Sequence, residues 1–266
     1  FGMEPEIGYT PPKEQVVPFT ERTEESVSPA ANGLTTSSNP EQHVKITPEL
    51  LKMGRTAFCK ETFGNEVFFT DIMGMMDGPI NFRTIGKALI KLGGKGTSNL
   101  QVELPRDVTV GGRTFHKGTT IDTGIDVPKG SYRPLGMTVK ITREGMKAGM
   151  TCAACHATVG SRTGQVIEGA PNNDLNAGFV MAFASNSAAY FRHTDVNPQQ
   201  KVFLKKYLAD LGNRSKPSVA LPDIEKFEDA VDRTLMSWPA GNFDSSIDLK
   251  ANPAQIPDSF TFGEYP

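Results

Sequence analysis

The feature that most constrains this chain is a five-residue stretch, Cys152-Ala153-Ala154-Cys155-His156. Two cysteines separated by two residues and followed at once by histidine form the attachment pattern of a c-type haem. The spacing lets one turn of chain bring both thiols to the two vinyl groups of a porphyrin, and the histidine then supplies an axial nitrogen to the iron. The sequence therefore predicts one covalently bound haem c, held by Cys152 and Cys155, with His156 as the proximal ligand.

Two other uses of a Cys-x-x-Cys pair compete with haem attachment. A tetrahedral zinc site needs four ligands, usually including a second Cys or His pair at short spacing. The remaining cysteine, Cys59, and the remaining histidines, His43, His116 and His193, are scattered along the chain. A redox-active dithiol is the second alternative, and a histidine directly after the pair favours haem over it.

The composition excludes polyelectrolyte partners and bilayer-spanning segments. The chain has 266 residues, with 38% hydrophobic and 22% charged residues and a net charge of −2. No basic patch indicates nucleic-acid binding. No apolar run approaches the ~18 residues needed to cross a bilayer. We therefore expect no nucleic-acid partner and no transmembrane segment.

The expected location follows from the haem. Covalent haem attachment takes place outside the cytoplasm, yet residues 1–5 have neither the basic leader nor the apolar core of a signal peptide. We expect a periplasmic or otherwise extracytoplasmic protein whose signal peptide has been removed. Cys59 is then an odd thiol in an oxidising compartment. We expect it to pack as a small buried hydrophobe, with an additional thiol role as the alternative.

The chain is expected to consist of an arm and a haem domain. Residues 1–46 are predicted to form an extended arm or linker, because residues 1–40 are rich in Pro, Thr, Ser, Glu and Asn. The domain, residues 47–266, begins with the helix start Thr47-Pro48-Glu49. Helical spacing of apolar residues and the usual start and stop residues predict further helices. They are expected at residues 80–92, 145–152, 174–183, 198–211 and 222–238.

Residues 100–142 have a different pattern from these helices. Val, Ile and Phe residues alternate there with Gly, Pro and Asp, and Gly111-Gly112 and Pro128-Lys129-Gly130 have the composition of turn tips. We predict a small β-ribbon insertion at about 100–142. The expected fold class is mainly α: a cytochrome c-like helical haem domain with this insertion and long irregular termini.

Three stretches resemble the bacterial di-haem cytochrome c peroxidase superfamily, including its rubber-oxygenase-like branch. Residues 53–58 resemble the helix that precedes the first haem motif of that family, residues 152–156 match the motif, and residues 184–190 are similar to the stretch that follows it. The peroxidases of the family use two haems, whereas this chain has one motif and no histidine at residues 176–179, where the resemblance places a distal histidine. The resemblance thus implies either one haem domain of a larger parent or a derivative that kept only electron transfer.

The second axial ligand of the iron stays open among three side chains. Met181 is the first candidate, because it follows the haem loop on an apolar helix near the distal position that the resemblance implies. His193 is the second and Met236 the third. A methionine ligand raises the reduction potential and a second histidine lowers it. A vacant site, with Glu168 or Asp174 as a distal polar group, is the remaining alternative.

The sequence as a whole predicts electron transfer through one haem c, as a carrier or as a subunit of a redox complex. Its expected partners are redox proteins, including a multiprotein membrane-associated complex, with the arm and the β-ribbon as docking devices. The alternative is a haem peroxidase or oxygenase with an open distal site.

Overall fold

The computed structural model describes residues 46–195, 197–199, 202 and 224–259. The chain divides into two units, residues 1–55 and 56–266. The described end of the first unit belongs to helix α1 (Pro48–Lys60), whose first turn is capped by Thr47: its hydroxyl accepts the Leu50 N–H at 3.2 Å. This confirms the predicted helix start. The predicted arm, apart from Ile46, and most of the helix expected at 198–211 lie outside the described residues.

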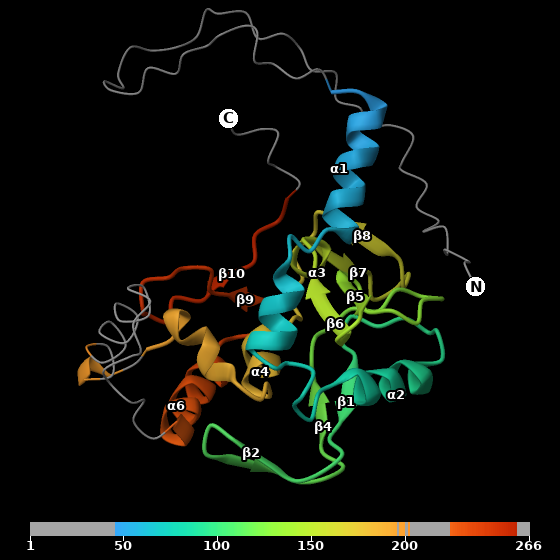
Figure 1. Ribbon diagram of the computed structural model, residues 1–266. Coiled ribbons are helices and arrows are strands. Elements are labelled where there is room, and N and C mark those ends of the chain that lie inside the picture. The colour runs from blue at the N-terminus through green and yellow to red at the C-terminus, as the bar shows by residue number, and fades with distance from the viewer. Residues whose placement is uncertain (1–45, 196, 200–201, 203–223, 260–266) are drawn as a thin grey trace, which may run out of the picture. The chain divides into compact units, whose positions relative to one another are not determined.

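The fold is a mixture of helices and small sheets, so the expected mainly α, cytochrome c-like fold is wrong (Figure 1). In the described part of the chain, 33% of the residues are helical and 19% lie in strands. After α1, the helical elements are η2 (Val67–Ile72), α2 (Phe82–Leu92), α3 (Ala153–His156), α4 (Ala177–Ala182), η3 (Ser187–His193) and α6 (Ile224–Met236).

The described strands form five two-stranded antiparallel sheets. They pair β1 (Gln101–Glu103) with β4 (Thr120–Asp122), β2 (Val108–Val110) with β3 (Arg113–Phe115), β5 (Met137–Thr142) with β6 (Gly145–Met150), β7 (Ala157–Val159) with β8 (Val166–Glu168), and β9 (Asn242–Phe243) with β10 (Ala254–Gln255). Gly111 and Gly112 form the β2–β3 tip with φ of 55° and 76°, which confirms the turn predicted there.

The helix predicted over residues 145–152 is wrong, because residues 145–150 are strand β6. It pairs with β5 in a register that runs from Met137↔Met150 to Thr142↔Gly145. The apolar residues Met146, Ala148 and Met150 alternate with period two, which is the pattern of a strand. Two glycines in this segment also lower its helix propensity.

The strands at 100–122 share one hydrophobic core with the helices. Leu100, Val102 and Ile121 are at most 3% exposed and belong to the same cluster as Leu89 of α2 and Leu235 of α6. Burial of each such side chain contributes roughly 1.5–3 kcal/mol. The β structure that the sequence assigned to a peripheral ribbon therefore helps to hold the helices in place.

Three predicted helices of the second unit are confirmed in type. Helix α2 begins with a capping box, in which Asn81 accepts the Thr84 N–H and the Thr84 side chain accepts the Asn81 N–H, and it ends at Gly93 with φ of 62°. Helices α4 and α6 lie within the segments predicted as helical. In each case a local start, stop or apolar stripe coincides with a buried face.

Candidate functional site

The Cys-x-x-Cys-His stretch forms the single helical turn α3, between strands β6 and β7. Cys152, at its N-terminal end, already has helical geometry with φ of −55° and ψ of −31°. Ala153 and Ala154 are 1% and 5% exposed, whereas Cys152 is exposed and Cys155 and His156 are half-buried. Because residues i, i+3 and i+4 share one side of a helix, the two cysteines and the histidine lie on one face and Ala154 on the other.

The alanine face is packed against backbone. A Cβ atom on Gly136, which has φ of 69°, would lie 2.0 Å from the Ala154 nitrogen. The Thr151 N–H also donates to the Gly136 carbonyl at 2.8 Å. The residue before β5 therefore touches the turn directly, and only glycine fits there.

Asn172 holds the other end of the turn, and the sequence analysis missed it. This side chain is 2% exposed. Its backbone N–H donates to the Cys155 carbonyl at 2.8 Å, its Nδ2 donates to the Ala154 carbonyl at 3.2 Å, and its Oδ1 accepts the Leu175 N–H at 3.1 Å. The last carbonyls of the turn are thereby satisfied. A polar residue in a loop rich in glycine gave no sequence signal for this role.

His156 is oriented by the C-terminal segment. Its Nδ1 lies 3.1 Å from the carbonyl oxygen of Pro257. A proton on Nδ1 that is donated to this carbonyl leaves the lone pair on Nε2, which is the tautomer of a metal-binding histidine. The segment is itself anchored, because the Ser259 N–H donates to Gly169 O at 2.7 Å and the Gly169 N–H to His156 O at 2.8 Å.

The thiols of the motif are free in the described structure. Burial, followed by the neighbouring Cys152 thiol, raises the pKa of Cys155 to about 11. Disulfide exchange needs a thiolate, and reactive cysteines have lowered pKa values. Cys155 is therefore a protonated thiol at neutral pH.

The described residues contain no group of three or more His, Cys, Asp or Glu side chains that converge to hold a metal ion. Of the scattered side chains, Cys59 is half-buried on α1. His116 is exposed, with Nδ1 3.5 Å from the Asp107 carboxylate.

The structure places Met181 and His193 in different surroundings. Met181 is 3% exposed and lines a small internal cavity, which Ala154 also lines. It therefore lies beside the alanine face of the turn. Met236 is the last residue of α6 and is partly buried. The polar alternatives, Glu168 and Asp174, are half-buried and exposed, respectively.

His193 stacks on Tyr190, with ring centroids 4.3 Å apart and an interplanar angle of 29°. Its Nδ1 is buried without a hydrogen bond, and the nearest carboxylate oxygen, Asp244 Oδ1, is 3.9 Å away. The Tyr190 hydroxyl donates to the Asp244 carbonyl at 3.0 Å. Burial first, and then the charges of Asp244 and Cys155, raise the pKa of Tyr190. Tyr190 thus connects the surroundings of His193 with those of Cys155.

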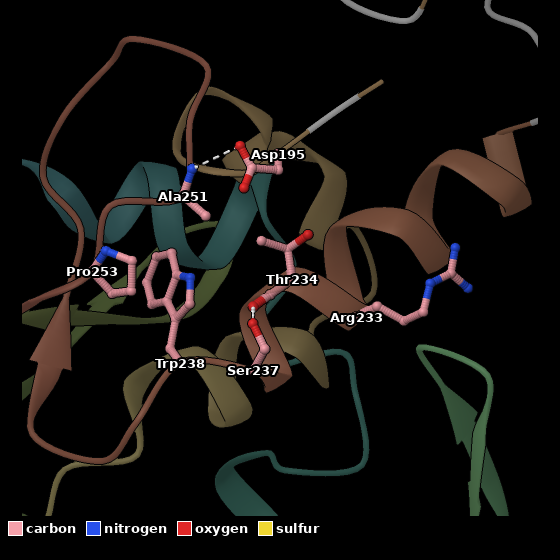
Figure 2. A pocket seen from close by; sticks show the side chains of 7 residues that line it. All are labelled: Asp195, Arg233, Thr234, Ser237, Trp238, Ala251 and Pro253. Carbon is pink, nitrogen blue, oxygen red and sulfur yellow. Dashed lines mark hydrogen bonds between the residues drawn. The ribbon is translucent and has the colours of Figure 1, made fainter. Parts of the chain in front are cut away.

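A separate surface pocket of about 390 Å³ lies beside α6 (Figure 2). It is lined by Asp195, Arg233, Thr234, Ser237, Trp238, Ala251 and Pro253. Figure 2 shows the Arg233 side chain extending away from the other lining residues. None of the side chains that the sequence assigned to a site lines this pocket.

Comparisons with protein-family models, with curated proteins and with solved structures found no match to this chain.

Proposed function

We propose that this chain transfers electrons through one haem c, bound covalently by Cys152 and Cys155, with His156 Nε2 as an iron ligand. The observation that carries the proposal is the orientation of the motif. Its two cysteines and its histidine share one face of the turn, and the Nδ1 of His156 faces the Pro257 carbonyl. This arrangement supports the haem interpretation although the fold is not the expected cytochrome c-like one.

The residues of this chain fit such a group in three ways. Two unpaired thiols stand at the required spacing. The histidine has its second nitrogen occupied by a backbone acceptor, as metal-bound histidines usually do. The turn that carries all three is fixed from both sides, by Gly136 and by Asn172.

For the second axial ligand we propose His193 in preference to Met181. Met181 lines the cavity that Ala154 also lines, on the buried side of the turn. His193 stacks on Tyr190, and its Nδ1 faces the Asp244 carboxylate. The charge of Cys155 also contributes to the raised pKa of Tyr190. At 3.9 Å the Asp244 carboxylate makes no hydrogen bond to the ring, so the proposal rests on the stacking of His193 against Tyr190. A pair of histidines lowers the reduction potential relative to a methionine ligand.

Haem c supplies a one-electron iron couple when it is bound. The chain's own residues attach the group through Cys152 and Cys155, orient His156 through Pro257 and exclude water from the alanine face. The single attachment motif favours electron transfer over the peroxidase or oxygenase alternative, since the peroxidases that the chain resembles use two haems. The partners proposed are redox proteins, alone or in a membrane-associated complex, in the periplasm or another extracytoplasmic space.

Among the described helices, none combines the length and the apolar character needed to cross a bilayer.

The test is a pyridine haemochrome assay with optical spectra of both redox states, on protein produced with a haem-attachment system. We expect one haem per chain, low-spin spectra, and no haem in a Cys152→Ser/Cys155→Ser variant. His193→Met should raise the reduction potential. It should also add the long-wavelength absorption band of a methionine–iron bond to the spectrum of the oxidised protein. A chain without covalent haem would refute the proposal. High-spin ferric iron with peroxide turnover would select the peroxidase alternative instead.

A further inference from the structure

A small cavity beneath the haem-attachment turn is lined by methionines from four segments of the chain. The residues are Met75, after η2, Met137, at the start of β5, Met150, at the end of β6, and Met181, in α4. The cavity has a volume of about 40 Å³. An organic ligand needs roughly 300–1,000 Å³. The cavity therefore has room for a single ion or for one or two water molecules.

All four methionines line this space. Met137 and Met150 are directly opposite each other in the β5–β6 register, so their side chains share one face, with Cβ atoms about 5 Å apart. The Met75 N–H donates to the Phe69 carbonyl at 2.9 Å, which fixes the turn that carries it. A methionine side chain is unbranched and has three rotatable bonds, so its sulfur adapts to a nearby centre.

Asp126 also lines this cavity, and its carboxyl oxygens have no hydrogen-bond partner. The residue is 1% exposed. The Thr158 hydroxyl and the Val159 N–H lie near this carboxyl group, but neither meets hydrogen-bond geometry with it. A buried carboxylate without a counter-charge is costly. A cation in the cavity would supply the missing charge.

The donor set indicates which cation fits. Thioether sulfur is a soft ligand that selects Cu⁺. Calcium and magnesium require several oxygen ligands, and zinc prefers thiolate, imidazole or carboxylate. We propose that this cavity binds one monovalent soft cation of the Cu⁺ class, held by the thioethers of Met75, Met137, Met150 and Met181 and neutralised by the Asp126 carboxylate.

This site does not depend on haem attachment. It is compatible with His193 as the iron ligand, because Met181 then keeps its sulfur for the cavity.

The test uses Ag⁺ as the probe, because Ag⁺ is a soft monovalent ion that is stable in air. The full chain carries Cys59→Ser, which removes a competing thiol, and is titrated in chloride-free buffer. Native mass spectrometry counts Ag⁺ and haem on the same molecules. The cation site and haem attachment are therefore tested independently of each other. If no haem is attached, the titration is repeated with Cys152→Ser/Cys155→Ser.

We expect one Ag⁺ per chain and a loss of affinity of about tenfold or more in Met137→Leu/Met150→Leu and in Asp126→Asn. Met146→Leu, which changes an exposed methionine of the same hairpin, should bind like the parent chain. Absence of Ag⁺, or unchanged binding in both cavity variants, would overturn the proposal. If the double variant does not fold, Asp126→Asn decides alone. A Met181→Leu change that alters the haem spectrum would assign that sulfur to iron and overturn the four-methionine site.

Discussion

The buried carboxyl of Asp126 makes a quantitative prediction about stability and pH. Its pKa is about 7 in the folded protein, and the ordinary value of 3.8 applies to the unfolded chain. Between these two values the folded state binds more protons than the unfolded state. The free energy of unfolding therefore falls as the pH rises through this window, and the stabilising effect is fully present only below the unfolded value.

The size of the effect follows from the two pKa values. Relative to pH 5, the carboxyl should lower the free energy of unfolding at pH 8 by about 3 kcal/mol. Asp126→Asn removes the titration and keeps the shape of the side chain. We expect the stability of the variant relative to the wild type to rise by about 3 kcal/mol between pH 5 and pH 8, because the burial cost of its unpaired amide is the same at both pH values.

Urea unfolding, followed by far-UV circular dichroism in metal-free buffer at pH 5 and pH 8, measures this difference. Burial also raises the pKa values of Glu228 and Asp232, that of Asp232 to about 6. These two groups contribute the same dependence of unfolding free energy on pH in the wild type and in the variant. Asp77→Asn removes an exposed carboxylate and is the matched control. Equal pH dependence in wild type and Asp126→Asn would refute the account of Asp126 as an unpaired buried acid.

The other predictions concern the turn that carries the motif. Gly136→Ala should destabilise the protein by about 3 kcal/mol or more, because its Cβ would meet Ala154 at 2.0 Å. Gly118→Ala, with φ of 85° and open space around the Cβ, should cost only about 1 kcal/mol in the same urea assay. Asn172→Ala should cost about 1–3 kcal/mol, because the Ala154 carbonyl loses its donor, and should lower the haem content per chain. A normal haem content with normal stability would exclude Asn172 as the clamp of the turn.

What the sequence predicted correctly was local. The cap of α1, the stop of α2 at Gly93 and the turn at Gly111-Gly112 each depend on residues within a few positions of one another. Such signals are readable because a cap or a tight turn has the same chemistry in any fold. The helices α4 and α6 were found in the same way, from a buried stripe at helical spacing.

What the sequence did not predict depends on distant contacts. Segment 145–150 preceded a helical turn and was assigned to a helix, although its alternation of Met146, Ala148 and Met150 matched a strand. Its partner β5 decides the outcome, and a pairing of strands is visible only in the folded chain. The shared core of strands and helices was missed for the same reason, and with it the fold class.

The haem proposal does not depend on the fold class that was expected. The residues that would bind the haem are consecutive, whereas the residues that hold them in position come from distant parts of the chain. Five consecutive residues supply the thiols and the imidazole. The acceptor for His156 comes from Pro257, which is 101 positions away, and the donor for Ala154 comes from Asn172. Neither support belongs to a sequence motif, since a backbone carbonyl can be presented by any residue. One distant carbonyl within hydrogen-bond distance of Nδ1 is therefore enough to orient the imidazole of such a motif, whatever the surrounding fold.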